Sequence, residues 1–311
     1  MIIAHTYYAN ILAHLAGLLA GTGTRLAVQH NPVQTFPFVA GHLDRLFASL
    51  GIYTAQVAVS DAVLDSMAAY PVRIKDRIHR VYNGIEFGQD QVPSWSPHLN
   101  HVPASVPKIL NVGRLSVQKN HQAMLETMAR LPNAHLVLVG EGEIRAKIES
   151  QVKGMKLTDR VTFVGEVPPE DVRAIMNCCD LFLFPSLWEA MPMSLLEAMA
   201  AGMPIVASNI PANCEALQDT GVLVPPEPTQ LVAAITELLN NPAAAAELGR
   251  KAAVRAHHFT VDSMVDGYER LFTAGSSKAP SRVDRHAPVQ ASLSRALRSV
   301  ETAGESNRRQ Q

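Results

Sequence analysis

The chain has 311 residues, 47% of them hydrophobic and 18% charged, so it can bury a large core and is long enough for two structural units. Its formal net charge of -1 offers no general attraction to nucleic acid, and none is expected as a partner. The spacing of its three cysteines resembles no metal site, which favours a reducing cytoplasm. No run reaches the roughly 18 apolar residues of a membrane span.

The first 87 residues alternate predicted strands with predicted helices. This alternation indicates parallel α/β packing. The apolar run Ile11–Ala20 is interrupted by His14 and follows no basic region, so it fits a helix packed on a sheet better than a signal peptide. The strands are expected near Met1–Ala4, Leu26–Gln29, Gln56–Ser60 and Ile78–Tyr82.

Four further segments follow along the chain. Residues 88–106 are rich in proline and polar side chains and are predicted to be a linker. A second α/β unit is expected over 107–258 and a last helix over 259–273. Residues 274–311 are serine-rich and nearly free of large apolar side chains, which predicts a disordered tail. A weak surface helix near Val289–Val300 that contacts anionic lipid is the open alternative.

Lys108–Leu125 reads as an apolar strand, a loop and an amphipathic helix. The strand breaks at Gly113, and the loop carries Arg114 and Lys119. An arginine forks onto phosphate oxygens and a lysine supplies a mobile point charge, so the pair suits a diphosphate. Two further strands are expected at His135–Val139 and Val161–Val164, the second followed by a glycine turn.

Asp180–Ser208 reads as a buried strand, a loop with Glu189 and a helix with Glu197. Ligands of open parallel sheets bind beyond such strand ends. Pro192 suits the first helical position, so the N–H groups of the next residues, Met193 and Ser194, are predicted to face a ligand.

Each glutamate has an alternative interpretation. Ser194 and Glu197 have the spacing of a capping box, and Glu189 fits a solvated loop acid.

The two motifs, in this order, resemble those of retaining glycosyltransferases of the GT-B fold, family four. The resemblance implies an α/β protein with two Rossmann-like domains facing a cleft. It implies that Gly113, Arg114 and Lys119 bind the donor diphosphate with the backbone of Met193 and Ser194. In the family, the two glutamates separated by seven residues hold the activated sugar, and Met191 is a further backbone donor here.

The same resemblance places other contacts. The turn Gly165, Glu166 and Val167 is expected at the nucleobase. His30, at the end of a strand, is expected beside the anomeric carbon, and His30 and Glu189 are the expected catalytic residues. His5 also fits a family pattern, but we interpret it as structural. Asn209–Glu215 stands where the family often has a glycine pair and a glutamate, and the glycines are absent here.

The implied function is transfer of a sugar from a nucleotide donor to a saccharide or lipid-linked acceptor with retention of configuration. No aspartate pair separated by one residue is present, so neither a metal nor a cofactor is expected. The protein is expected in the cytoplasm, with peripheral contact to the inner face of a membrane left open. The alternatives are a sugar isomerase or phosphorylase of the same fold, or a non-catalytic nucleotide-sugar binder.

One further expectation concerns the N-terminal domain. Met1 stands at what resembles the family's fourth strand, so this domain is expected to be incomplete and its first strand to form an apolar edge. Poor sugar transfer is expected from such a chain.

Overall fold

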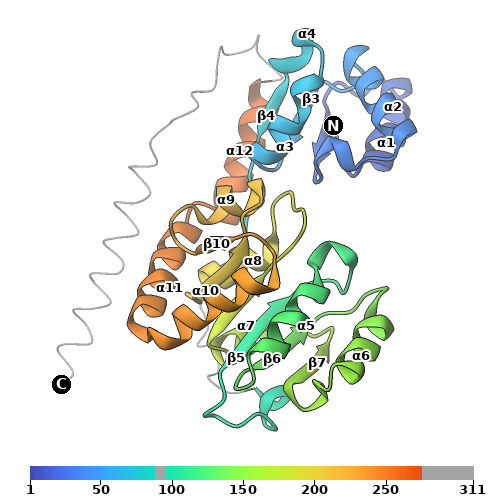
Figure 1. Cartoon of the computed structure of the whole chain (residues 1–311). Coiled ribbons are helices and arrows are strands. Elements are labelled where there is room, and N and C mark those ends of the chain that lie inside the picture. The colour runs from blue at the N-terminus through green and yellow to red at the C-terminus, as the bar shows by residue number, and fades with distance from the viewer. Residues whose placement is uncertain (88–95, 275–311) are drawn as a thin grey trace, which may run out of the picture. The chain divides into compact units, whose positions relative to one another are not determined.

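The structure, a computed structural model, describes residues 1–87 and 96–274. Its strands form two parallel sheets, each built from alternating strands and helices (Figure 1). The predicted α/β class is therefore confirmed. Residues 88–95 of the predicted linker and 275–311 of the predicted tail lie outside the described residues.

The N-terminal sheet has the order β1-β2-β3-β4, with β1 at one edge. The four predicted strands are confirmed to within two residues at each end, because each is a short segment that turn residues delimit. The elements are β1 Ile2–His5, α1 Tyr7–Leu19, β2 Arg25–Gln29, α2 Phe38–Ser49, β3 Ala55–Ala58, α3 Asp61–Ser66, α4 Val72–Lys75 and β4 Ile78–Arg80.

The second sheet has the order β10-β9-β8-β5-β6-β7, all parallel. Read from β7, this is the doubly wound Rossmann order. β6 and β7 are added on one side of β5 and the later strands on its other side, so the strand order reverses between β5 and β8. The elements are β5 Lys108–Val112, α5 His121–Arg130, β6 His135–Val139, α6 Arg145–Gly154, β7 Val161–Gly165, α7 Pro169–Asn177, β8 Leu181–Phe184, α8 Met193–Ala200, β9 Ile205–Ser208, α9 Pro211–Leu217, β10 Val222–Val224, α10 Pro228–Asn240, α11 Pro242–Ala256 and α12 Val261–Ala274.

The second sheet is buried on both faces. Along β8, Phe182 and Phe184 enter one apolar cluster, whereas Leu181 and Leu183 enter the other. All four side chains are fully buried, as expected for a strand with helices on each side of its sheet. This arrangement fixes which residues emerge at the end of β8.

The N-terminal domain buries polar residues beneath two helices. α1 buries Asn10 and His14, and α2 buries Asp44. The Asp44 carboxylate accepts hydrogen bonds from Tyr53 (3.0 Å), Gln29 (3.1 Å) and Tyr70. Burial raises the pKa of Asp44, and these bonds partly offset the rise. The group is therefore paired by neutral donors rather than by a cation.

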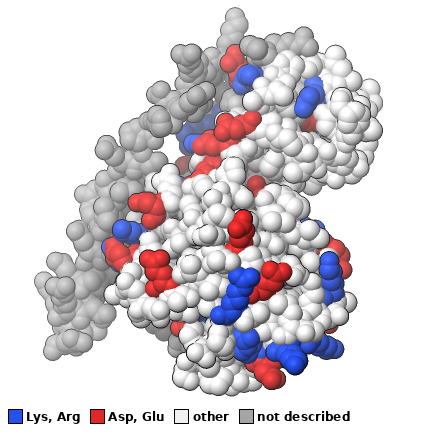
Figure 2. Space-filling model, in the orientation of Figure 1, with Lys and Arg blue, Asp and Glu red and all other residues white. Residues whose placement is uncertain are grey.

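The outer faces of the same helices carry apolar side chains. Figure 2 shows few charged side chains over α1 and α2. The exposed apolar residues of these two helices include Tyr8, Leu12, Leu15, Leu18, Leu19, Phe38, Val39 and Leu46. Within the described part of the chain, no helix is long and apolar enough to cross a membrane.

Two chain segments that connect the sheets lie side by side. Ile85 and Thr260 form a parallel bridge, and the Ile85 N–H donates to the Phe259 carbonyl at 2.8 Å. α12 then passes the end of β4 (Figure 1), where Gly267 faces Val81. The last helix thus begins two residues later than predicted. Residues 96–106, predicted as linker, contain the buried side chains of Leu99 and Val102.

This crossing requires a glycine. A Cβ on residue 84 would lie 2.5 Å from the Thr260 carbonyl oxygen and 2.6 Å from the Val261 backbone. We expect Gly84→Ala to lower the free energy of unfolding by about 1–3 kcal/mol, because backbone must move to relieve the overlap. The matched control is Gly23→Ala, since nothing lies within 4 Å of a Cβ there. The control should leave stability unchanged or raise it by about 0.4–1 kcal/mol. Equal urea midpoints for the two variants would contradict the assignment.

Candidate active site

A cleft of about 490 Å³ lies between the two sheets. It is lined from the N-terminal domain by His30 and Asn31, which directly follow β2. The remaining lining residues follow β5 and β8 or open α8: Gly113, Arg114, Gln118, Lys119, Glu189, Met191, Pro192, Met193, Ser194 and Glu197. The structure therefore brings nine of the predicted site residues to one cleft.

Topology explains this convergence. Because β5 and β8 are neighbours at the reversal of strand order, the loops after them leave the sheet at the same edge. The Gln118 side chain donates to the Trp188 carbonyl at 2.8 Å, and the Leu187 N–H donates to the Gln118 carbonyl at 2.8 Å. Asn120, in a left-handed conformation, donates to the Pro185 carbonyl at 3.2 Å. These bonds fix the two loops to one another.

Lys119 and Glu189 form an ion pair in the cleft. The Lys119 Nζ lies 2.7 Å from Glu189 Oε1, with side-chain exposures of 12% and 8%. The same ammonium lies 4.5 Å from the centroid of the Phe184 ring. Such a desolvated pair stabilises the loops only while both partners remain.

Arg114 differs from Lys119. Its side chain is exposed, and it forms no ion pair with any residue in 1–87 or 96–274. The cleft therefore offers one unpaired guanidinium beside a paired ammonium. Gly113 leaves room for the lysine, because a Cβ there would lie 3.0 Å from Lys119 Cε.

The start of α8 differs from the prediction. Pro192 adopts an extended conformation before the helix and does not occupy its first position. Ser194 is the second helical residue, and no side chain caps this helix, so the capping-box interpretation is wrong. Met193 and Ser194 supply N–H groups that have no acceptor within the helix, and both residues line the cleft.

Glu197 is an exposed residue of α8. Desolvation by the surrounding cleft raises its pKa, and Arg173 partly offsets this rise. Its carboxylate therefore protonates at a higher pH than an ordinary glutamate.

His30 is paired with His5 across the ends of β1 and β2. His5 Nδ1 lies 2.9 Å from His30 Nε2, so one ring donates and the other accepts. Burial lowers the pKa of His30, and His5 lowers it further. Burial thus favours the neutral form of the His30 ring. Sequence reasoning assigned His5 only a structural role.

Gly165, Glu166 and Val167 do not line this cleft. Gly165 ends β7, the edge strand beyond β6, and its carbonyl accepts the Gly140 N–H at 2.8 Å. Asn31 and Gln118 line the cleft and were missed by sequence reasoning. The one sequence signal for these two residues is their position beside predicted site residues: Asn31 follows His30, and Gln118 precedes Lys119. Among residues 1–87 and 96–274, no group of three or more His, Cys, Asp or Glu could hold a metal ion.

Two Rossmann-like sheets whose carboxyl ends face a shared cleft define the GT-B fold. Solved structures agree with this description. HepE of Anabaena, crystallised with UDP and glucose, aligns at a TM-score of 0.75 and 20% identity over 88% of this chain and 77% of its own. Sucrose-phosphate synthase of Thermosynechococcus elongatus aligns at 0.74 and 22% identity over 88% of this chain and 74% of its own.

The family model described as glycosyl transferases group 1 matches residues 100–255, about half of the chain. The chain belongs to this family.

Curated relatives agree with this assignment. Alpha-maltose-1-phosphate synthase of Mycolicibacterium smegmatis is 28% identical over 71% of this chain and 63% of its own length. The 2-deoxystreptamine glucosyltransferase of Streptomyces kanamyceticus is 31% identical over 44% of this chain and 37% of its own. The chain thus spans less than two thirds of the length of these relatives.

The ion pair generates a stability prediction. Lys119→Met keeps the aliphatic stem but leaves the Glu189 carboxylate desolvated and unpaired, and should cost about 3 kcal/mol in urea denaturation. Adding Glu189→Gln should restore most of the loss, because no uncompensated charge then remains. Arg250→Met on α11 is the control, since its partner Glu247 is exposed and the pair should matter little. A Lys119→Met loss no larger than the control loss would refute the coupling.

Proposed function

We propose that this protein is a retaining glycosyltransferase that moves a sugar from a nucleotide donor to a saccharide or lipid-linked acceptor. The observation that carries the proposal is the cleft itself. It combines the unpaired Arg114 guanidinium, the Lys119–Glu189 pair and the uncapped start of α8, with His30 on the opposite wall. Family membership supports the same reaction class.

The diphosphate is proposed to bind between Arg114 and α8. The guanidinium would fork onto phosphate oxygens, and the N–H groups of Met193 and Ser194 would donate to the others. Lys119 would share its charge between the diphosphate and Glu189. These donors are fixed before the reaction, so they would stabilise the charge that develops on the leaving diphosphate.

The sugar is proposed to lie against Glu189 and His30. Glu189, held by Lys119, would accept hydrogen bonds from sugar hydroxyls, while Glu197 would accept from both ribose hydroxyls. Met191, which lines the cleft, would supply a further backbone donor. A nucleobase contact at Gly165–Val167 stays a prediction that the cleft lining does not support.

The proposed reaction exchanges one bond at the anomeric carbon. The bond from that carbon to the phosphate oxygen breaks first, and the acceptor hydroxyl oxygen then forms its bond on the same face, so configuration is retained. The acceptor proton passes to the departing phosphate oxygen. We propose that Arg114 and Lys119 replace the divalent cation used by other transferases, and a loss of turnover on adding a chelator would contradict this part.

A panel of nucleotide sugars tests the proposed function. Mass spectrometry of the products should detect a sugar joined to an acceptor, together with a nucleoside diphosphate. A rearranged sugar or a sugar 1-phosphate would instead indicate an isomerase or a phosphorylase. Binding without any product would indicate a non-catalytic binder.

Removal of the free guanidinium should weaken nucleotide binding. Arg114→Ala should reduce the affinity for UDP or another nucleoside diphosphate by roughly 1.5–3 kcal/mol, the worth of hydrogen bonds to a charged group. Titration calorimetry measures the effect. Lys147→Ala, which changes an exposed cation on α6, should bind as the wild type does. Equal affinities for the two variants would rule out the phosphate role of Arg114.

The role of Glu197 separates binding from stability. Because no capping bond involves this residue, Glu197→Gln should leave the melting temperature unchanged while weakening donor binding about tenfold. The raised pKa adds a second expectation. Wild-type affinity should fall as pH decreases through a range above that of an ordinary glutamate, because protonation removes acceptors. The glutamine variant should show no such fall. A lower melting temperature with normal binding would favour a structural role.

A further inference from the structure

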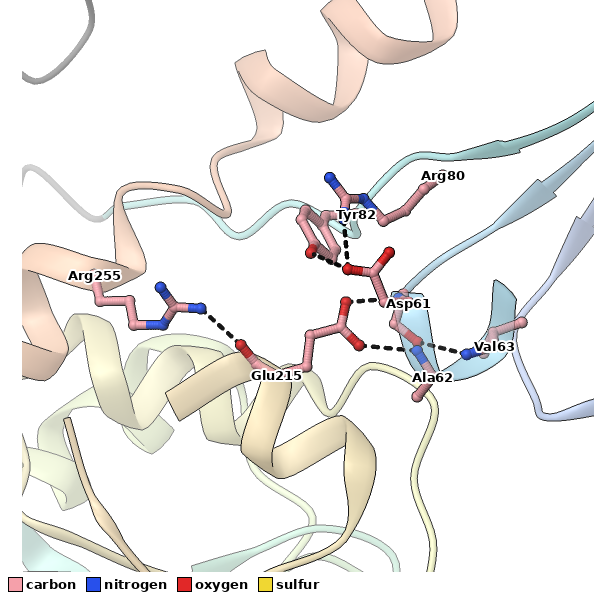
Figure 3. A network of polar contacts seen from close by, with 8 residues as sticks. Asp61, Ala62, Val63, Arg80, Tyr82, Glu215 and Arg255 are labelled. Carbon is pink, nitrogen blue, oxygen red and sulfur yellow. Dashed lines mark hydrogen bonds and ion pairs between the residues drawn. The ribbon is translucent and has the colours of Figure 1, made fainter. Parts of the chain in front are cut away.

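Glu215 of α9 connects the two domains through its carboxylate. Oε1 accepts the Asp61 N–H at 2.6 Å, and Oε2 accepts the Ala62 N–H at 3.0 Å (Figure 3). Asp61 and Ala62 open α3 in the N-terminal domain, and α3 packs against α9. One side chain therefore binds two consecutive backbone amides that lie 154 and 153 positions away in the sequence.

The charge of Glu215 makes this contact strong. Both carboxylate oxygens are occupied, so the bonds are charge-assisted and directional. The side chain is half-buried, and burial is the main cause that raises its pKa. The bonds from Asp61 and Ala62 and one from Tyr82 lower the pKa in part, whereas the nearby Asp61 carboxylate raises it. The carboxylate is therefore held in place by the partners it binds.

Both sides of the contact are anchored. On the N-terminal side, Ser60 caps Val63 at 3.1 Å and Arg80 pairs with the Asp61 side chain at 2.6 Å. On the other side, Arg255 donates to the Glu215 carbonyl at 2.6 Å (Figure 3). The Arg255 guanidinium also lies 5.7 Å from the centroid of the Phe259 ring, at the chain crossing. Each side of the contact is thus held by further polar bonds.

The contact lies one strand away from the cleft on each sheet. In the N-terminal sheet, His30 follows β2 and Asp61 follows the neighbouring β3. In the second sheet, Glu189 follows β8, and α9 with Glu215 follows the neighbouring β9. A change in the spacing at Glu215 must therefore change the spacing between His30 and Glu189.

We propose that Glu215 is a positioning residue that holds α3 against α9 and thereby sets His30 opposite the Lys119–Glu189 pair. The proposal rests on the proposed function, because only a reaction across the cleft requires this spacing. It assigns Glu215 to the contact between the domains rather than to the sugar.

Nuclear magnetic resonance of the full chain tests the contact. As pH is lowered, the amide proton signals of Asp61 and Ala62 should move upfield when Glu215 becomes protonated, and their exchange with solvent should become about tenfold faster relative to unprotected amides. Glu215→Gln should abolish the pH-dependent part. Asp61, Arg80, Tyr82, Asp219 and Arg255 also face this region, and they remain in the variant, so the difference isolates Glu215.

Small-angle scattering tests positioning. Glu215→Ala should increase the radius of gyration relative to the wild type, whereas Glu237→Ala, an exposed glutamate of α10, should not change it. Amide signals that do not respond to Glu215 would overturn the contact. Responsive amides with an unchanged radius of gyration would overturn the positioning role. The wild-type pH titration decides the contact even if a variant fails to fold.

Calorimetry with UDP keeps the two proposals separate. The proposed nucleotide site lies on the second domain, so Glu215→Ala should bind UDP as the wild type does. If neither the wild type nor Glu215→Ala binds UDP while the amide and scattering responses are as expected, the proposed function is refuted and the role of Glu215 in the contact is not. Normal UDP binding with no amide response would refute only the role of Glu215.

Discussion

The reversal of strand order between β5 and β8 is the constraint on which the candidate site depends. It brings together two loops that lie 70 residues apart in sequence, and it lets the Lys119 ammonium pair with the Glu189 carboxylate. If all strands were added on one side of the sheet, the loops that carry Arg114 and Glu189 would lie at different places along its edge. The hydrogen bonds that Gln118 and Asn120 donate then hold these two loops in a fixed arrangement. The position of the cleft is therefore set mainly by strand order, and individual side chains then fix its detailed geometry.

The N-terminal domain contains a buried network of polar side chains. Its interior contains the Asp44 carboxylate with hydroxyl and amide donors around it, where the second domain has phenylalanine and leucine. Polar networks of this kind fix mutual orientation more strictly than apolar contacts do, because each bond has a preferred direction. β2 passes through this network and ends at Gln29, so His30, the next residue, has a defined position relative to α1 and α2.

Much of the fold was predictable because buried parallel strands are short apolar runs that glycine and proline interrupt. His135–Val139 was predicted to the residue for this reason. Most cleft residues were also predictable, since Arg114 and Glu189 lie in the loops that follow such runs and match the motifs of the family that the sequence resembles. Pairings between distant segments were not. Glu215 shows no periodicity that indicates a partner 154 positions away, and the His5–His30 contact requires knowledge that β1 and β2 are neighbours. Pro192 was misplaced by one position because proline fits both the cap and the first turn of a helix.

The paired crossing at Ile85 and Thr260 restrains the connection between the two domains. Two adjacent segments joined by a bridge resist sliding, because sliding would break the bond from Ile85 to the Phe259 carbonyl. With no side chain at Gly84 the two segments lie close together. A larger residue at this position would separate them and with them the start of α12 from the end of β4, so one missing side chain keeps the connection between the domains narrow.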